Sequence, residues 1–179
     1  GKTLRGALEH RDMLPLHLVH AYVVDNQCLF AQLGGEGKGR ELDTIPPLLG
    51  MLPLAGGTVT IDALGCSKAV AEQIVEAGAD YLLALKGNQP KLHEEVERYL
   101  LDAETDGFAG LPYTTAKTEE RAHGRQETRK AVVTSVAETM PVCSDWPSLK
   151  SLVKVGRQRR VGEQVQEETQ LYISSLANL

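Results

Sequence analysis

Aromatic residues, cysteines and long apolar runs are all scarce in this sequence. Only 4% of its 179 residues are aromatic, which argues against a protein that binds single-stranded nucleic acid mainly by stacking bases on aromatic side chains. The three cysteines, Cys28, Cys66 and Cys143, are far apart and form neither a CxxC pair nor a spacing typical of zinc sites, so we expect a reducing, cytoplasmic setting. No apolar run reaches about 18 residues and no basic-then-apolar leader is present, so we expect neither a membrane span nor a signal peptide. Because the chain begins at Gly1 without methionine, we expect an excised piece of a longer protein.

Phosphate-binding and nucleophile motifs are missing as well. The sequence contains no GxGxxG, GxxxxGK[ST] or GxSxG pattern, and these absences argue against a nucleotide-binding enzyme or a hydrolase with a nucleophile elbow. Cys66 precedes a predicted helix, where a thiol pKa falls. No histidine follows it at a suggestive distance, so a nucleophilic role is not favoured.

The charge is unevenly distributed along the chain. The formal net charge is −5, yet residues 117–160 carry 10 Lys and Arg against 5 Asp and Glu. A basic cluster attracts phosphates locally even on an acidic protein, because screening limits the reach of each patch to about 8–10 Å. The alternative is a solvated basic face with no partner.

The first half predicts a β-hairpin followed by alternating helices and strands. Two apolar, β-prone runs at 18–24 and 28–33 flank a polar tight turn, which is typical of a hairpin. Residues 1–6 resemble the exit of an earlier strand. A helix is predicted at 41–52, with Pro46 and Pro47 tolerated only near its first turn.

A parallel strand-helix-strand unit is predicted over residues 58–86. The strand at 58–62 leads to Ser67, a suitable N-cap for an amphipathic helix that ends at Gly78, and the next strand covers 80–86. A helix at 91–101 and a loop at 102–112 follow. Residues 113–179 lack helical periodicity and are β-prone at their ends, so we expect two regions: an α/β core with a mixed sheet at 1–112 and an antiparallel β-rich region at 113–179.

Asp62 stands at the carboxyl end of a buried strand, where open α/β sheets place their ligand sites. With Gly65 permitting a sharp turn, its carboxylate suits a divalent metal. The alternative is an Asp that accepts hydrogen bonds from turn amides. Lys86, Asn88 and Gln89 follow the next strand and project near Asp62, either for function or for turn chemistry.

The densest polar cluster is the run HGRQETR. In a strand His123, Arg125, Glu127 and Arg129 share one face, so the arginines can clamp phosphates while Glu127 orients them. A cross-strand salt-bridge ladder is the alternative. A hairpin turn is expected around a further basic group, which consists of Lys154, Arg157, Arg159 and Arg160. These side chains can contact the DNA backbone or simply be solvated, and solvation is favoured.

Five segments together resemble a known family. In order, they are GKTLRG, HLVHAYVV, the run TVTIDALGCSKAVAEQIVEAGADYLLALKGNQPKLHEEV, HGRQETR and LYISSL. Their order and spacing resemble DDE transposases of bacterial insertion sequences, in the H-repeat-associated group. The resemblance covers nearly the whole chain.

The resemblance implies a ribonuclease H-like fold, with a mixed five-stranded sheet whose first three strands are antiparallel and a β-rich insertion. It implies an enzyme of DNA transposition and recombination that cleaves DNA at insertion-sequence ends and joins it to target DNA by two-metal phosphoryl transfer with Mg²⁺ or Mn²⁺. It also implies double-stranded DNA as partner, a homo-oligomer, no membrane, and a bacterial cytoplasmic, nucleoid-associated location.

The resemblance also implies a catalytic triad of three acidic residues that bind the metal ions. The second of these acids falls on Asp62, as catalytic residue and metal ligand. The first would precede Gly1 and the third would follow Leu179, so we expect this piece to be inactive alone. Glu127 is a candidate substitute, although its strand resembles the insertion. The DNA-binding candidates are Lys86, Asn88, Gln89, His123, Arg125 and Arg129. The alternative function is an inactive or repurposed piece that only binds DNA or protein.

Overall fold

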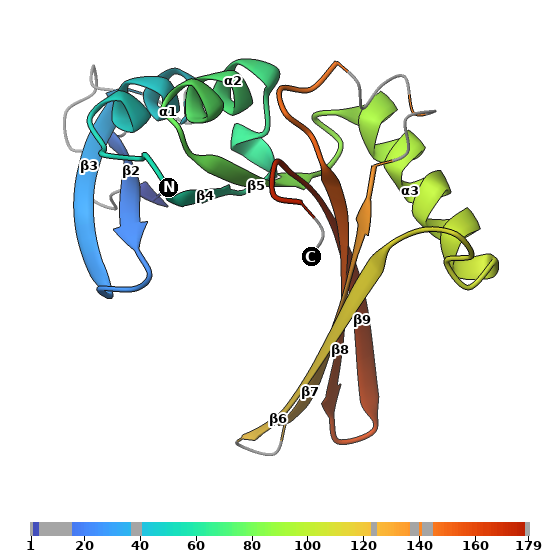
Figure 1. Ribbon diagram of the computed structural model, residues 1–179. Coiled ribbons are helices and arrows are strands. Elements are labelled where there is room, and N and C mark those ends of the chain that lie inside the picture. The colour runs from blue at the N-terminus through green and yellow to red at the C-terminus, as the bar shows by residue number, and fades with distance from the viewer. Residues whose placement is uncertain are drawn as a thin grey trace.

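A computed structural model describes residues 2–3, 16–36, 41–122, 125–136, 140 and 145–177. These residues form two antiparallel or mixed β-sheets and three α-helices. Figure 1 shows an α/β body from which four long strands project as a ribbon. Among the described residues, none of the helices combines the length and apolar character needed to cross a membrane.

The first three strands form a separate antiparallel sheet in the order β1-β2-β3. Strand β1 covers Lys2–Thr3, β2 covers Leu16–Val23 and β3 covers Cys28–Glu36. The predicted hairpin is confirmed: Val23 pairs with Cys28 across a four-residue turn. The five-stranded sheet that the family resemblance implies is not continuous within the described residues, because β4 and β5 join a different sheet.

The predicted parallel crossover unit is confirmed. Strand β4 (Thr58–Ile61) pairs in parallel with β5 (Asp80–Leu85), and helix α2 (Lys68–Glu76) connects them after a short 3₁₀ helix, η1 (Ala63–Gly65). The Ser67 side chain accepts a hydrogen bond from the Val70 amide at 3.3 Å, as an N-cap should. Gly78 has a φ of 73°, the left-handed conformation that ends helices.

Two helices differ from the sequence prediction. Helix α1 covers Glu41–Gly50 and holds Pro46 and Pro47 in its interior rather than near its first turn. The carbonyl of Pro46 accepts a hydrogen bond from Gln73 Nε2 at 2.8 Å, which ties α1 to α2. Helix α3 covers Pro90–Thr105, so the start of the expected loop at 102–112 is helical. Buried Ala103 explains the extension, because it continues the apolar stripe of Leu92, Val96 and Leu100 by one further turn.

The second sheet has six strands in the order β4-β5-β9-β8-β7-β6. Strands β6 (Tyr113–Ala122), β7 (Arg125–Ser135), β8 (Ser151–Val161) and β9 (Gln164–Ser174) are antiparallel neighbours, which confirms the expected β-rich pattern. The end of β9 pairs with β5, so the sheet runs unbroken across residue 112.

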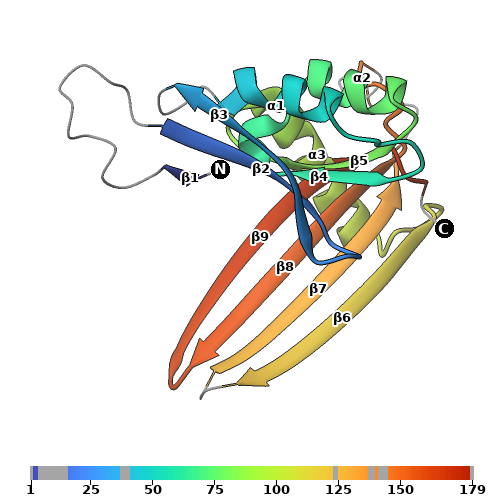
Figure 2. The same cartoon turned by 90° about the vertical axis from the view of Figure 1, so that its left-hand side faces the viewer.

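One hydrophobic core joins the two expected regions. Helices α1 and α2 cover one face of β4 and β5 (Figures 1 and 2). Helix α3 lies farther across the sheet and contacts β9. The apolar side chains of the three helices pack with buried side chains of β5, β8 and β9, and partly buried residues of β2 and β4 pack against this cluster. The largest fully buried members are Tyr81, Leu83 and Leu85 of β5, Leu152 of β8, Ile173 of β9, Ile74 of α2, and Leu92 and Leu100 of α3.

Candidate functional site

The ends of β4 and β5 bring Asp62 and Lys86 to one edge of the sheet. The two strands are parallel, with Ile61 opposite Leu83, so both chains leave the sheet on the same side. Side chains alternate along strands, so Asp62 points to the same face as Thr60, and Lys86 to the same face as Ala84 and Leu82. Thr60 lies opposite Leu82, so these two faces are one. Both groups therefore belong to the sheet face that α1 and α2 leave uncovered.

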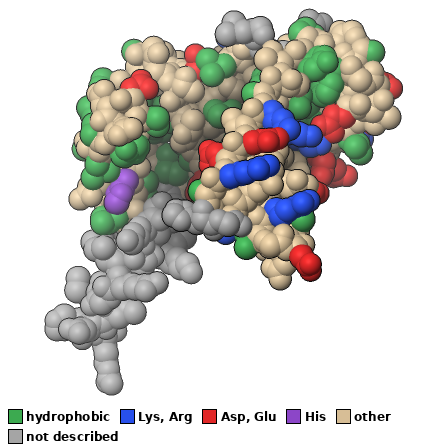
Figure 3. Space-filling model, turned by 90° about the horizontal axis from the view of Figure 1, so that it is seen from below, with side chains coloured by type: hydrophobic (Ala, Val, Ile, Leu, Met, Phe, Trp, Pro, Cys, Tyr) green, Lys and Arg blue, Asp and Glu red, His purple; other side chains and the backbone are tan. Residues whose placement is uncertain are grey.

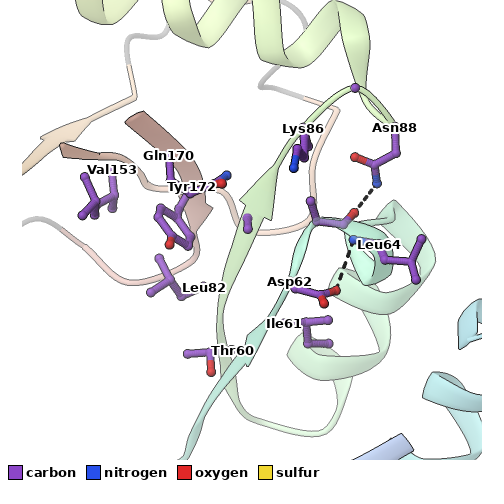
Figure 4. A pocket seen from close by; sticks show the side chains of 14 residues that line it. Thr60, Ile61, Asp62, Leu64, Leu82, Lys86, Asn88, Val153, Gln170 and Tyr172 are labelled. Carbon is purple, nitrogen blue, oxygen red and sulfur yellow. Dashed lines mark hydrogen bonds between the residues drawn. The ribbon is translucent and has the colours of Figure 1, made fainter. Parts of the chain in front are cut away.

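An open groove of about 1000 Å³ lies on that face. Its floor is supplied by β5, β8 and β9, and its polar end by the residues after β4 and β5 (Figure 4). Gln170 and Tyr172 were missed by the sequence prediction, because nothing in the sequence tells which strand lies beside β5. The lining residues are Thr60, Ile61, Asp62, Ala63, Leu64, Leu82, Ala84, Lys86, Gly87, Asn88, Val153, Val155, Gln170 and Tyr172.

The Asp62 carboxylate is exposed at the polar end of this groove. One of its oxygens accepts a hydrogen bond from the Leu64 amide at 3.2 Å, so Asp62 also caps η1. The structure thus contains the turn-amide contact that the sequence left open. A single such bond still leaves lone pairs of the carboxylate exposed to the groove.

Asn88 and Gln89 hold the turn that follows Asp62. Asn88 Nδ2 donates to the carbonyls of Ala63 and, at 3.3 Å, Cys66, while Gln89 Nε2 donates to the Cys66 carbonyl at 3.1 Å (Figure 4). Turn chemistry therefore occupies both amide groups. Whether they also contact DNA stays a prediction.

Gly65 is required by space in the same turn. A Cβ at this position would lie 2.7 Å from Ile45 Cδ1 and would also collide with the Ile61 side chain. The turn can therefore pack against α1 only without a side chain here. This position adds a packing reason to the turning role that the sequence indicated.

Lys86 is exposed and lines the groove. Among the described residues, no carboxylate lies within ion-pair distance of its ammonium group. A cation without an internal partner beside an open groove can bind an anion such as a phosphate.

The described residues fit part of a divalent metal site. Among the residues that the structure describes, Asp62 is the one acid that lines the groove, and no cluster of three or more His, Cys, Asp or Glu occurs. Magnesium is commonly held by one or two carboxylates together with waters and substrate phosphates. Asp62 therefore fits as one oxygen ligand, and a complete two-metal site needs further ligands.

Glu127 lies away from the groove, in the projecting strands. Its carboxylate pairs with Arg129 of β7 and, at 2.8 Å, with Arg157 of β8, and its side chain is only 4% exposed. The hydrogen bond from Arg157, reinforced by the charges of Arg129, Arg157 and Arg125, lowers the pKa of Glu127 despite the opposing effect of burial. This geometry is the salt-bridge ladder that the sequence allowed. A catalytic role for Glu127 stays a prediction.

The other members of this cluster are placed differently. Arg125 is exposed, His123 lies outside the described residues, and Arg129 reaches a second acid, Glu120, at 3.8 Å. The expected hairpin turn after β8 is present, with Val161 paired to Gln164. The Arg157 partnership was missed because Arg157 is 30 residues from Glu127 in sequence, and only the strand register joins them.

Cys66 is buried, and burial raises the pKa of its thiol to about 12. A thiol of this kind is protonated at neutral pH and is therefore a poor nucleophile. Cys66 packs in the hydrophobic core, in agreement with the expectation that a nucleophilic role is not favoured.

Comparisons with known proteins give one consistent result. A family model described as "Transposase DDE domain" matches residues 8–169. A protein of Xanthobacter autotrophicus, named "Uncharacterized protein in dhlA 3'region", is 41% identical over 175 residues, which cover 98% of this chain and 58% of the relative. The "H repeat-associated putative transposase YhhI" of Escherichia coli K12 is 34% identical over 186 residues, covering 98% of this chain and 47% of the relative.

Another similar protein is the "Putative transposase YncI" of Escherichia coli O157:H7. It is 38% identical over 156 residues, which cover 85% of this chain and 39% of the relative. The matched part of the chain thus spans between 39% and 58% of the length of these curated relatives. No solved structure matches this chain.

Proposed function

The chain belongs to the transposase DDE domain family, and on that premise we propose that it is part of the catalytic core of an insertion-sequence transposase. In the longer protein, this core cleaves DNA at the ends of the element and joins them to target DNA. The observation that carries the proposal is the position of Asp62. Its exposed carboxylate lies at the carboxyl end of β4, beside an open groove.

Asp62 would supply one oxygen ligand for Mg²⁺ or Mn²⁺. When bound, such ions activate the attacking oxygen and stabilise the leaving oxygen in phosphoryl transfer. The role of the chain's own residues is positioning: Asn88 and Gln89 fix the turn that presents Asp62. Lys86, exposed at the end of β5, would bind a DNA phosphate that enters the groove, and Arg125 would bind another further along the same sheet face.

We propose a ribonuclease H-like core for the complete domain, with β6–β9 as its β-rich insertion. The antiparallel β1-β2-β3 sheet and the parallel β4-β5 pair support this proposal. The partners would be double-stranded DNA, at element ends and target, and further copies of the protein. Alone, this chain is expected to be inactive, since its described residues offer the groove a single carboxylate.

The test is strand cleavage by the longer protein carrying Asp62→Asn. This substitution preserves size and removes the charged ligand, so cleavage should fall by more than about 100-fold, because even residues that only orient a metal ligand cost about 10- to 100-fold when mutated. Binding of duplex DNA in EDTA should persist. Unchanged cleavage would remove Asp62 from the active site, whereas lost binding together with lost cleavage would indicate a folding defect.

A further inference from the structure

The projecting strands present two faces with different electrostatics. We call the described residues 117–122, 125–130 and 156–169 the arm; Figure 3 shows Lys and Arg side chains gathered around its end, with Asp and Glu between them. Directly opposed residues of antiparallel strands point to the same face. The register therefore separates a Glu127 face, with Arg125, Arg129, Arg157 and Arg159, from an Arg160 face, with Lys117, Arg121 and Lys130.

Two of the four arginines of the Glu127 face, Arg129 and Arg157, are engaged with acids of the same face. Arg129 and Arg157 both contact the buried Glu127 carboxylate, and Arg157 also reaches Glu168 at 3.8 Å. A phosphate that captured these guanidinium groups would leave Glu127 without its partners, and an unpaired buried charge is unfavourable. Arg129 and Arg157 are thus compensated within their own face, whereas Arg125 and Arg159 form no ion pair among the described residues.

Cations of the Arg160 face are mostly free of such partners. Lys117 pairs with Glu119, and the other acid of this face, Glu167, accepts a hydrogen bond from Gln158 at 2.7 Å. Arg121, Lys130 and Arg160 are exposed. Within the described ranges, no carboxylate lies within ion-pair distance of these three side chains, although the charge of Arg121 contributes to the lowered pKa of Glu119.

The three free cations are spaced over two rows of the sheet. Arg121 and Arg160 both flank Gln126, so they lie about 10 Å apart across two strand spacings. Lys130 is four residues further along β7, about 13 Å away, a separation comparable with the width of about 12 Å of the DNA major groove. Towards the body, the Lys154 ammonium is bound to Glu104 of α3 at 2.7 Å, so the free cations end before the acidic helix.

We propose that the Arg160 face, through Arg121, Lys130 and Arg160, binds the phosphate backbone of a DNA duplex. Val155 of β8 lines the Asp62 groove, and alternation along the same strand turns Arg160 to the opposite face. The duplex is therefore a different one from that at Asp62, or a different segment of it. The inference rests on the proposed DNA-binding function, but it does not depend on Asp62 or on any metal.

The test is the salt dependence of binding of a short fluorescent duplex to the 179-residue chain in EDTA. Each phosphate contact contributes about 0.9 to the slope of log affinity against log salt, so the triple variant R121A/K130A/R160A should lower the slope by about 2.7. A matched control, K91A/R98A/K150A, removes three exposed cations of α3 and of the segment before β8, and it should leave the slope unchanged.

A single-site comparison separates the two faces. Arg160→Ala should lower the slope by about one, and Arg125→Ala reports on the Glu127 face. The proposal is overturned if the triple variant has the same slope as its control. It is also overturned if only Arg125→Ala lowers the slope, or if the wild-type chain shows no salt-dependent binding. Circular dichroism of each variant checks folding. Since the assay contains EDTA, an error in the Asp62 assignment leaves it unaffected, and failure here leaves the cleavage test of Asp62→Asn intact.

Discussion

The side-chain amide of Asn88 donates a hydrogen bond to the main-chain carbonyl of Ala63, the residue that follows Asp62. This bond connects the end of β5 to the turn after β4 (Figure 4). The position of the Asp62 carboxylate therefore depends on a residue 26 positions later in the sequence. Hydrogen bonds from a side chain to the main chain of another segment fix loops that carry functional groups.

Replacing Asn88 should loosen that turn. Asn88→Ala removes a donor to two carbonyls and should lower the free energy of unfolding by about 1 kcal/mol, with faster amide hydrogen exchange at residues 63–66. Asn88→Asp keeps the size but replaces the donor with a carboxylate that faces carbonyl oxygens, so its exchange should rise at least as much. If only the Ala variant exchanges faster, packing rather than hydrogen bonding holds the turn.

Gly65 should be intolerant of a side chain. The Cβ of Gly65→Ala would overlap the side chains of Ile61 and Ile45, and overpacking of this kind costs about 1–3 kcal/mol. Gly87→Ala is the matched control, since a Cβ there meets nothing within 4 Å, and its unfolding free energy should change by no more than about 0.5 kcal/mol. Chemical denaturation measures both, and equal stabilities would refute the packing argument.

Glu127 should make the arm sensitive to acid. The pKa of this carboxyl is lowered in the folded chain, chiefly by the hydrogen bond from Arg157. A lowered folded pKa means that its stabilising contribution is complete above the ordinary Glu value of about 4.3 and is lost as the pH falls through the lower folded value. Wild type should therefore exceed Glu127→Gln in unfolding free energy at pH 7, with a difference that shrinks below about pH 4. A pH-independent difference would contradict the ion-pair account.

Cys66 should resist alkylation. Burial raises the pKa of its thiol to about 12, so almost no thiolate exists at pH 8, whereas Cys28 is exposed. Treatment of the native chain with iodoacetamide, followed by peptide mass analysis, should label Cys28 well before Cys66. Comparable labelling of the two would show that the turn around Cys66 opens readily, and unfolding in denaturant should abolish the difference.

The local elements were predictable because their signals are local. The Ser67 cap and Gly78 bracket α2, and the β-prone runs on either side of a polar turn define the β2–β3 hairpin. The end of α3 was misplaced because its last turn is set by the burial of Ala103, whereas the polar residues around Ala103 in the sequence are typical of a loop.

The pairing of strands that are distant in sequence could not be predicted. The position of Asp62 and Lys86 at one sheet edge followed from the parallel crossover, which the sequence indicates. The floor of the groove did not, because Tyr172 lies opposite Ala84 only through the pairing of β9 with β5. In the arm, alternation correctly placed Arg125, Glu127 and Arg129 on one face, but it could not show that Arg157 would engage Glu127 from the neighbouring strand.

Metal rescue at position 62 tests the central claim most directly. In the longer protein, Asp62→Cys replaces a hard oxygen ligand with a soft thiolate, which disfavours Mg²⁺ and suits softer ions. Strand cleavage by this variant should be lost with Mg²⁺ and partly restored by Mn²⁺, whereas Asp62→Ala should stay inactive with both. Cleavage by Asp62→Cys at the wild-type rate in Mg²⁺, or by Asp62→Ala with either ion, would contradict the assignment of Asp62 as a metal ligand.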